Sequence, residues 1–326
     1  MAGSFLISVV VEEVMGKTVK KIILANPRGF CAGVERAIST VKLAVKQYGA
    51  PIFVLHEIVH NKHVVQELER LGVVFVNDLV DIPRKAICIF SAHGVSVEIE
   101  MRAKTLGLRT IDGTCPLVGS VHNMVEKYYA DGYDVLIIGH HKHPEVEGTA
   151  GRVRGNVHIV ATEEDAHSVQ VQDSNRVAYV TQTTLSQDDI KGILVILNER
   201  FPNIKGQKSN ICYATLNRQR AMREIGEKCD TLLVVGSKNS SNSNRLREVG
   251  ERSGMKGYLI DDEHDIEKHW LDGVSTICIT AGASAPERLV QGVIAFLQKQ
   301  GFDQFEEMSE KDERIVFNPA ILEDKR

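Results

Sequence analysis

Short runs of apolar residues alternate with amphipathic segments along most of the chain. Several apolar runs are continuous and rich in β-branched residues, which is typical of strands in a parallel sheet covered on both faces. The pattern predicts strands at 21–25, 52–55, 73–76, 86–90, 135–138, 157–160, 177–181, 232–235, 258–260 and 276–280. It predicts helices at 34–47, 62–71, 121–130, 188–200, 216–228 and 286–298. This alternation indicates an α/β fold with parallel sheets, and periodicity leaves open whether there is one large sheet or several smaller ones.

Length, composition and charge exclude several classes of protein. A chain of 326 residues predicts two or three domains. Hydrophobic residues make up 43% and charged residues 25%, which excludes disordered, collagen-like and coiled-coil chains. Lys and Arg number 39 against 43 Asp and Glu, so the chain lacks the basic excess of a nucleic-acid or membrane-surface binder. We therefore expect a small-molecule partner, no nucleic acid and no membrane.

The cellular compartment is predicted from the first residues and from the cysteines. The apolar stretch at 5–11 has no basic flank and is far shorter than the roughly 20 residues that cross a bilayer, so we expect neither signal peptide nor membrane span. Six cysteines are too few for a disulfide-stapled secreted scaffold. The sequence predicts a cytoplasmic protein whose cysteines are buried, catalytic or bound to metal.

The six cysteines fall into two groups by local context. One group lies inside predicted strands or at a helix end and behaves as small buried hydrophobes: Cys88, Cys278 and Cys229. The other group lies in turns just before predicted helices: Cys31, Cys115 and Cys212. Free backbone N–H groups and the helix dipole there favour a thiolate, which is the form that binds metal. The spacing matches no short zinc or ferredoxin motif and leaves open a shared metal site or three independent thiols.

Three thiolates would suit two kinds of metal centre. A cubane iron–sulfur cluster normally takes four cysteines, so three would leave one iron open to bind substrate as a Lewis acid. Zinc with three protein ligands and an open position is the rival. Ligation by sulfur alone favours the cluster without excluding zinc.

A second metal motif is a decoy. His56-Glu57-Ile58-Val59-His60 matches the H-E-x-x-H pattern of zinc proteases, which needs both histidines on one helix. Here the match directly follows a predicted strand, and Asn61 has the features of an N-cap. Both histidines should precede the helix, although His60 remains free to contact a ligand.

Two polar turns are candidates for catalysis and binding. The turn at 140–145 places Glu145 at a predicted helix start beside His143, which makes Glu145 a candidate proton donor, unless the turn is merely a solvated surface. The run at 240–244 precedes another helix, where hydroxyls, amides and free N–H groups form a phosphate cradle or simply cap the helix. Ser284 repeats that arrangement, and two such turns together with the imidazoles of His60, His93 and His143 would suit a diphosphate.

Seven motifs together resemble one family. They are NPRGFCAG at 26–33, SAHG at 91–94, TCPLV at 114–118, HPEVEGT at 143–149, TQTTLS at 181–186, CYAT at 212–215 and SKNSSNSNR at 237–245. In this order they closely resemble the IspH or LytB family, the 4-hydroxy-3-methylbut-2-enyl diphosphate reductases of the non-mevalonate isoprenoid pathway. The resemblance runs from about residue 20 to residue 286.

The resemblance implies a cofactor, a reaction and roles for particular residues. It implies one 4Fe–4S cluster with three ligands, Cys31, Cys115 and Cys212, and one open iron that binds the substrate's allylic hydroxyl. Two electrons and two protons would remove that hydroxyl as water and give isopentenyl and dimethylallyl diphosphates. Glu145 matches the proton donor and Thr183 the hydroxyl beside it. The positions that match substrate-binding residues are His60, His93, His143, Thr183, Ser240, Ser241, Asn242 and Ser284.

The resemblance also implies an architecture and partners. Three small parallel-sheet α/β units would surround a pseudo-threefold axis with the cluster at the centre. Their expected limits are 33–116, 117–206 and 1–32 plus 207–305, followed by a tail at 306–326. Residues 1 to about 19 have no counterpart in the family core, and Met15 is an alternative start. We expect a ferredoxin or flavodoxin as electron donor and a monomer or homodimer. A non-enzymatic iron–sulfur sensor or cluster carrier is the alternative function.

Overall fold

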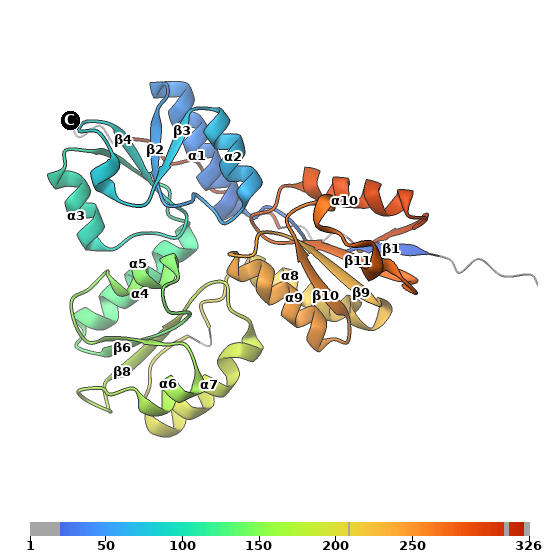
Figure 1. The fold of residues 1–326 in the computed structure, drawn as a ribbon. Helices are drawn as coiled ribbons and strands as arrows, with labels where there is room; N and C mark the ends of the chain where they lie inside the picture. The colour runs from blue at the N-terminus through green and yellow to red at the C-terminus, as the bar shows by residue number, and fades with distance from the viewer. Residues whose placement is uncertain (1–19, 208, 310–312, 323–326) are drawn as a thin grey trace, which may run out of the picture.

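Three α/β units surround a common centre in the computed structural model, which describes residues 20–207, 209–309 and 313–322 (Figure 1). Each unit has its own sheet, and the described strands form sheets of four, three and five strands. All of the strand pairs are parallel. The predicted fold class of three small parallel-sheet units is confirmed.

Unit 1 carries the sheet β3-β2-β4-β5. Its strands are β2 (Ile52–Leu55), β3 (Val73–Val76), β4 (Ile87–Phe90) and β5 (Arg109–Asp112). Its helices are α1 (Ala32–Tyr48), α2 (Lys62–Arg70) and α3 (Val97–Thr105), with a 3-10 turn η1 at Leu79–Asp81.

Unit 2 carries the smallest sheet, β7-β6-β8. Its strands are β6 (Asp134–Ile138), β7 (Val157–Val160) and β8 (Val177–Thr181). Its helices are α4 (Pro116–Ala130), α5 (Pro144–Ala150), α6 (Glu163–Ser168) and α7 (Gln187–Arg200). A single parallel bridge joins Ala178 to Lys205 on the open side of β8.

Unit 3 carries the sheet β10-β9-β11-β1-β12, to which both ends of the described chain contribute. Its strands are β1 (Lys21–Leu24), β9 (Thr231–Val235), β10 (Lys256–Ile260), β11 (Thr276–Ala281) and β12 (Gln304–Glu307). Its helices are α8 (Tyr213–Ile225), α9 (Ser241–Arg252) and α10 (Glu287–Lys299), with 3-10 turns η2 (Gly226–Lys228), η3 (Glu263–Asp265) and η4 (Lys268–Leu271).

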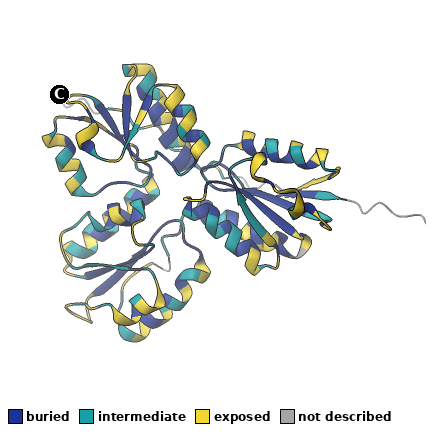
Figure 2. Ribbon diagram, in the orientation of Figure 1, coloured by how far each residue is buried: buried dark blue, intermediate teal, exposed yellow. Residues whose placement is uncertain are grey.

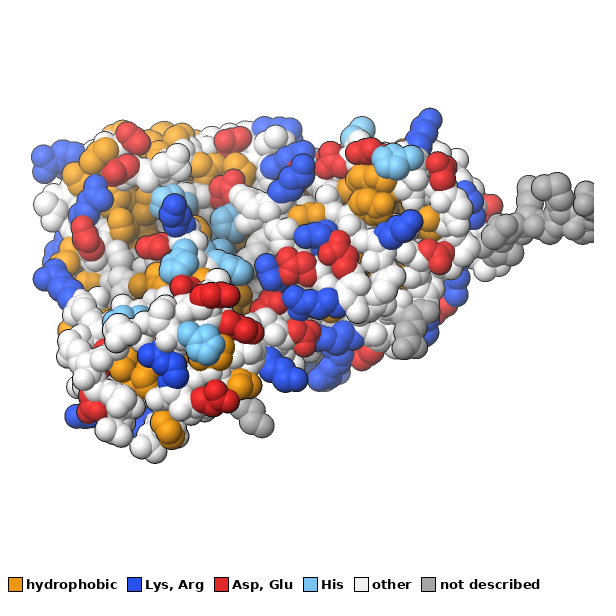
Figure 3. Space-filling view, turned by 60° about the horizontal axis from the view of Figure 1, so that its bottom comes forward, with side chains coloured by type: hydrophobic (Ala, Val, Ile, Leu, Met, Phe, Trp, Pro, Cys, Tyr) orange, Lys and Arg blue, Asp and Glu red, His pale blue; other side chains and the backbone are white. Residues whose placement is uncertain are grey.

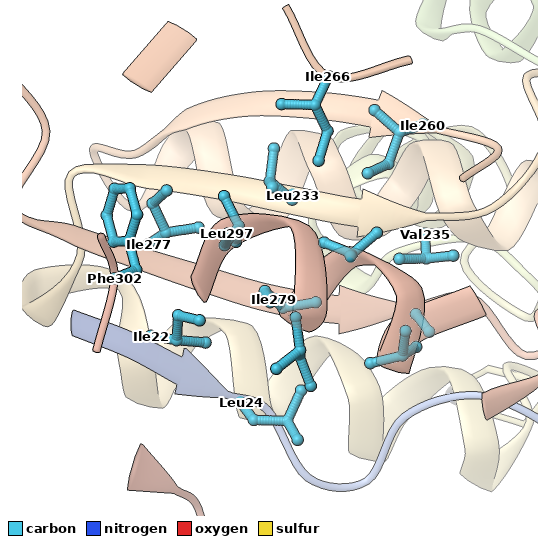
Figure 4. Close-up of a cluster of buried hydrophobic side chains, with 14 of the residues drawn as sticks. Ile22, Leu24, Leu233, Val235, Ile260, Ile266, Ile277, Ile279, Leu297 and Phe302 are labelled. Atoms are coloured by element: carbon cyan, nitrogen blue, oxygen red, sulfur yellow. The ribbon is translucent and has the colours of Figure 1, made fainter. Parts of the chain in front are cut away.

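Each sheet has its own apolar core. In unit 3, Ile22, Ile277 and Ile279 from neighbouring strands pack against Leu297 of α10 and the fully buried Phe302 (Figure 4). Figure 2 shows the central strands as the buried centre of every unit and the helices as its partly exposed cover. Strands covered on both faces explain why the apolar runs in the sequence are continuous rather than alternating.

All of the predicted strands are present. The two strands that the prediction missed have exposed, polar sequences. Strand β5 was missed because three of its four residues are exposed, and β12 because it is exposed throughout. Helices α4 and α8 begin three to five residues earlier than predicted, at Pro116 and Tyr213. Each begins directly after a cysteine N-cap, and cysteine is not among the residues that mark helix starts in a sequence.

The chain returns to unit 1 after completing the sheet of unit 3. The backbone N–H of Ala320 donates to Thr40 Oγ1 on α1 at 2.9 Å, and Leu322 packs against the core of unit 1. The sheets assign strands to units without fixing limits between them, so the expected domain boundaries stay a prediction. The extension at residues 1–19, with Met15, lies outside the described residues. No helix in the described ranges is both long and apolar enough to cross a membrane.

Candidate active site at the junction of the three units

Three cysteines lie where the chain passes from one unit to the next. Cys31 separates β1 of unit 3 from α1 of unit 1, and Cys115 separates β5 of unit 1 from α4 of unit 2. Cys212 follows unit 2 and precedes α8 of unit 3. All three are helix N-caps, yet none of their side chains caps its helix. The Cys212 thiol instead shares a hydrogen bond with the Thr215 hydroxyl, at 3.2 Å.

The same backbone hydrogen bond anchors each of these cysteines. In every case the cysteine N–H donates to a carbonyl in the loop that follows the neighbouring strand of its sheet. The distances are 3.2 Å from Cys31 to Ala283, 3.0 Å from Cys115 to Ala92 and 3.0 Å from Cys212 to Thr183. Because those loops also carry Ser284, His93 and Thr183, each bond holds a cysteine beside a predicted substrate-binding residue.

The sulfur atoms lie close together without forming a tight triplet. A Cβ atom built on Gly33 would lie 2.5 Å from Cys115 Sγ and 3.8 Å from Cys31 Sγ, so only glycine fits between them. Among the described residues, Cys31, Cys115 and Cys212 do not form a group whose ligand atoms all lie within 4.8 Å of one another. The site is thus wider than a single metal ion requires.

Burial governs the protonation of the thiols. It raises the pKa of Cys115 to about 12 and that of Cys212 to about 11. The backbone N–H groups at the two helix starts do favour the thiolate, as predicted, but desolvation of the charge outweighs them. A bound cation would supply the opposite charge that a buried thiolate needs. The donor set, three desolvated sulfurs, fits an iron–sulfur cluster.

A cavity of about 110 Å³ lies against the three cysteines. The structure brings every predicted site residue to its wall: Cys31, Cys115, Cys212, His60, His93, His143, Glu145, Thr183, Ser240, Ser241, Asn242 and Ser284. The cavity has room for several water molecules. Residues from all three units line it, so the site exists only where the units meet.

Three histidines form one cluster at the cavity. The rings of His60 and His93 stack with centroids 4.3 Å apart, and His143 meets each of them edge-on at 5.8 Å. Figure 3 shows histidine side chains gathered on one face of the molecule. Burial lowers the pKa of His143 to about 4 and that of His93 well below its ordinary value. Both rings are neutral at physiological pH.

Hydrogen bonds fix the orientation of two of these rings. His143 Nδ1 accepts the backbone N–H of Glu145 at 3.1 Å, so the hydrogen of the neutral ring is on Nε2. His60 Nδ1 lies 3.0 Å from Glu57 Oε2, and this contact lowers the pKa of Glu57. The other ring nitrogen of His60, Nε2, is buried without a hydrogen-bond partner among the described residues. The Nε2 atoms of His60 and His143 are therefore suited to hydrogen-bond a polar ligand.

Glu145 is a buried carboxyl whose two oxygens are both hydrogen-bonded. It lies in the first turn of α5, and only 4% of the residue is exposed. Its Oε1 accepts the backbone N–H of Thr183 at 2.6 Å, and its Oε2 accepts the Thr183 hydroxyl at 2.9 Å. Burial raises the pKa of Glu145 to about 7, against the opposing effect of those hydrogen bonds. A carboxyl with this pKa is half protonated near neutral pH.

The N-terminus of α9 presents donors to the same cavity. Ser240 Oγ accepts the Ser243 N–H and caps the helix. Asn242 is 5% exposed, yet neither polar atom of its side chain has a partner among the described residues. Since buried amides normally have partners, this side chain is suited to hydrogen-bond a bound polar ligand. The helix dipole favours an anion there.

Two further residues complete this wall of the cavity. Ser284 Oγ donates to the carbonyl of His60 at 3.0 Å and so links unit 3 to unit 1. Ser241 Oγ accepts a hydrogen bond from the Thr184 hydroxyl at 2.9 Å, which links unit 3 to unit 2. Thr184 lines the cavity but was missed, although its place beside Thr183 in a strand-to-helix turn could have indicated it.

The decoy motif and the remaining cysteines lie as predicted. Helix α2 begins at Lys62 with Asn61 as its N-cap, so His56 and His60 both precede it. His56 is exposed, with φ 60°, while His60 lines the cavity, which excludes a shared zinc site on one helix. The other three cysteines, Cys88, Cys229 and Cys278, are buried in the sheet cores.

Comparison with known proteins gives the same family throughout. A family described as "LytB protein" matches residues 22–298. A 4-hydroxy-3-methylbut-2-enyl diphosphate reductase of Desulfotalea psychrophila is 60% identical over 93% of this chain and 97% of its own. One from Pseudomonas entomophila is 51% identical over 91% of this chain and 96% of its own.

A solved structure agrees with these relatives. The E-1-hydroxy-2-methyl-but-2-enyl-4-diphosphate reductase of Plasmodium falciparum is 39% identical, with a TM-score of 0.88, and the match covers 92% of this chain and 96% of that one. The family match, the relatives and the shared fold each span most of the chain, and the chain therefore belongs to the LytB family.

Proposed function

We propose that this chain is a reductive dehydroxylase that acts on 4-hydroxy-3-methylbut-2-enyl diphosphate. Two electrons and two protons enter, the allylic C–O bond breaks, and the hydroxyl leaves as water. The products are isopentenyl and dimethylallyl diphosphates. The observation that carries this proposal is a protonatable carboxyl, Glu145, in one cavity with three cysteine thiols and an anion-binding helix N-terminus.

We assign Cys31, Cys115 and Cys212 as the ligands of a 4Fe–4S cluster. A bound cluster with one open iron would act as a Lewis acid on the substrate hydroxyl and deliver the electrons. Ligation by sulfur alone favours such a cluster over one zinc ion.

The chain's own residues would hold the diphosphate at the other end of the cavity. Ser240, Ser241 and the buried Asn242 offer hydroxyl and amide groups at the N-terminus of α9. The Nε2–H of His143 offers another donor. An anion held there would gain from the helix dipole and would give Asn242 the partners it otherwise lacks. This orientation leaves the hydroxyl end of the substrate free to face the cysteines.

Glu145 would supply a proton to the leaving hydroxyl or to the reduced carbon chain. Thr183 would orient the carboxyl, because it bonds both oxygens through its backbone N–H and its hydroxyl. The surrounding apolar wall keeps the carboxyl protonated at a pH where an exposed glutamate is ionised. A non-enzymatic cluster carrier or sensor would need neither this acid nor the anion site. The ferredoxin or flavodoxin donor, the monomer or homodimer and the cytoplasmic location stay predictions.

We predict that Cys115→Ala loses most of its iron and acid-labile sulfide, whereas Cys88→Ala keeps the wild-type content. Cys115 lines the cavity, while Cys88 is a fully buried strand residue of unit 1. Both variants would be purified without oxygen, and iron and sulfide would be measured per chain. Equal losses in the two variants would contradict the assignment of ligands.

We predict that Glu145→Gln keeps its iron and sulfide but turns over about 10²- to 10⁴-fold more slowly than wild type, the usual contribution of a general acid. Glutamine preserves the size of the side chain and its acceptor oxygen while removing the proton. The assay follows substrate loss and the formation of both diphosphate products. Turnover near the wild-type value would refute the role of Glu145.

We predict that kcat/KM falls as the pH rises through about 7, because the acid form of Glu145 is then lost. Above that pH the fall should approach about tenfold per pH unit, as for one titrating group. His93 and His143 are already neutral at pH 7, so their titration does not contribute to this fall in kcat/KM. Reduced methyl viologen is a suitable donor because its potential does not change with pH. A flat profile from pH about 6 to about 9 would contradict the assignment.

A further inference from the structure

One buried arginine connects two of the three cysteine loops. Arg218 lies on α8 and is 0% exposed. Its Nε and Nη2 both donate to the carbonyl of Gly29, at 3.2 and 2.8 Å, and Nη2 also reaches the carbonyl of Phe30 at 3.3 Å. Its Nη1 donates to the carbonyl of Ala214 at 2.9 Å. A single guanidinium thus joins the turn before Cys31 to the first turn after Cys212.

The backbone around Cys31 is shaped for this contact. Gly29 has φ 65°, a left-handed conformation that favours glycine, and a Cβ atom there would lie 3.2 Å from the carbonyl of Ala285. A second link runs beside the first, since the backbone N–H of Ala32 donates to the Tyr213 hydroxyl at 3.4 Å. The two helix starts that follow Cys31 and Cys212 are therefore tied together twice.

The charge on Arg218 is balanced from the far end of the chain. Glu313 carboxylate oxygens lie 3.2 and 3.3 Å from Arg218 Nη1, and the Glu313 side chain is only 14% exposed. The amide of Asn217 donates to the same carboxylate at 2.9 Å. A buried guanidinium without a counter-charge is costly, so Glu313 is part of what makes this arrangement stable.

We propose that Arg218 and Glu313 are positioning residues that hold Cys31 and Cys212 at the spacing a cluster needs, so that the C-terminal segment is a structural part of the cluster site. This inference rests on the proposed function, because it takes Cys31 and Cys212 as cluster ligands. Neither residue lines the cavity. Arg218 acts through the backbone carbonyls of Gly29, Phe30 and Ala214, and Glu313 acts through its contact with Arg218.

The test is the rate at which oxygen-free protein loses iron to a ferrous chelator. In Arg218→Lys the charge stays, but a lysine cannot bond the three carbonyls in the planar geometry of a guanidinium. We expect iron release at least about tenfold faster than in wild type, the effect of losing one hydrogen bond of a charged group. Glu313→Gln should also release iron faster than wild type. This second variant still tests the proposal if Arg218→Lys does not fold.

Two matched variants serve as controls. Arg200 also bonds two backbone carbonyls, those of Ala166 and Val169, but it lies in unit 2 away from the cysteines. Glu251 also pairs with an arginine, Arg247, which keeps a second partner in Glu248. Arg200→Lys and Glu251→Gln should release iron at the wild-type rate.

The outcomes separate this inference from the function on which it rests. Wild-type release rates in both Arg218→Lys and Glu313→Gln would overturn the positioning role and leave the proposed reaction intact. Equal acceleration in Arg200→Lys would also overturn it, because the effect would then be a general loosening of the fold. A wild-type chain that binds no iron and sulfide would overturn the cluster and this inference together.

Discussion

The site depends on three passages of the chain from one unit to the next, all of which meet at the centre of the molecule. Each passage ends in a cysteine N-cap whose N–H is bonded to a neighbouring strand-end loop. In each sheet, the segment that leads to a cysteine lies beside one strand, and that strand lies beside a second one. The order is β2-β4-β5 in unit 1, β9-β11-β1 in unit 3, and β6-β8 followed by the segment at Lys205 in unit 2. Every unit therefore delivers one cysteine and two polar loops to the same cavity.

Unit 3 keeps this order although its parts come from both ends of the sequence. Strand β1 leads to Cys31 and pairs with β11, which in turn pairs with β9. The loop after β9 contains Ser240. The same geometry gives Ser240, His60 and His143 corresponding places after β9, β2 and β6. Desolvation at this junction then sets the chemistry, because it keeps His143 neutral and Glu145 protonatable.

The α/β fold class and the grouping of the cysteines could be predicted from local sequence. The exposed strands, the long-range contacts and the effects of burial could not, for physical reasons. Cys31, Cys115 and Cys212 differ from Cys88 in lying before helices rather than inside strands, a local signal that the sequence carries in full. The exposed strand β5 lacks an apolar pattern, so its place was not visible. The contact of Arg218 with Glu313 joins residues far apart in the sequence, and no motif marks either of them. The pKa of Glu145 depends on burial, which no sequence pattern encodes.

Cys31, Cys115 and Cys212 at this junction are proposed to hold an iron–sulfur cluster. The most direct test is the content of iron, acid-labile sulfide and zinc per chain after strictly oxygen-free purification. Iron and sulfide approaching about four each, without stoichiometric zinc, is the result expected for a cubane cluster. Stoichiometric zinc without sulfide would contradict the account, and the three thiols would then have to be interpreted as a zinc centre.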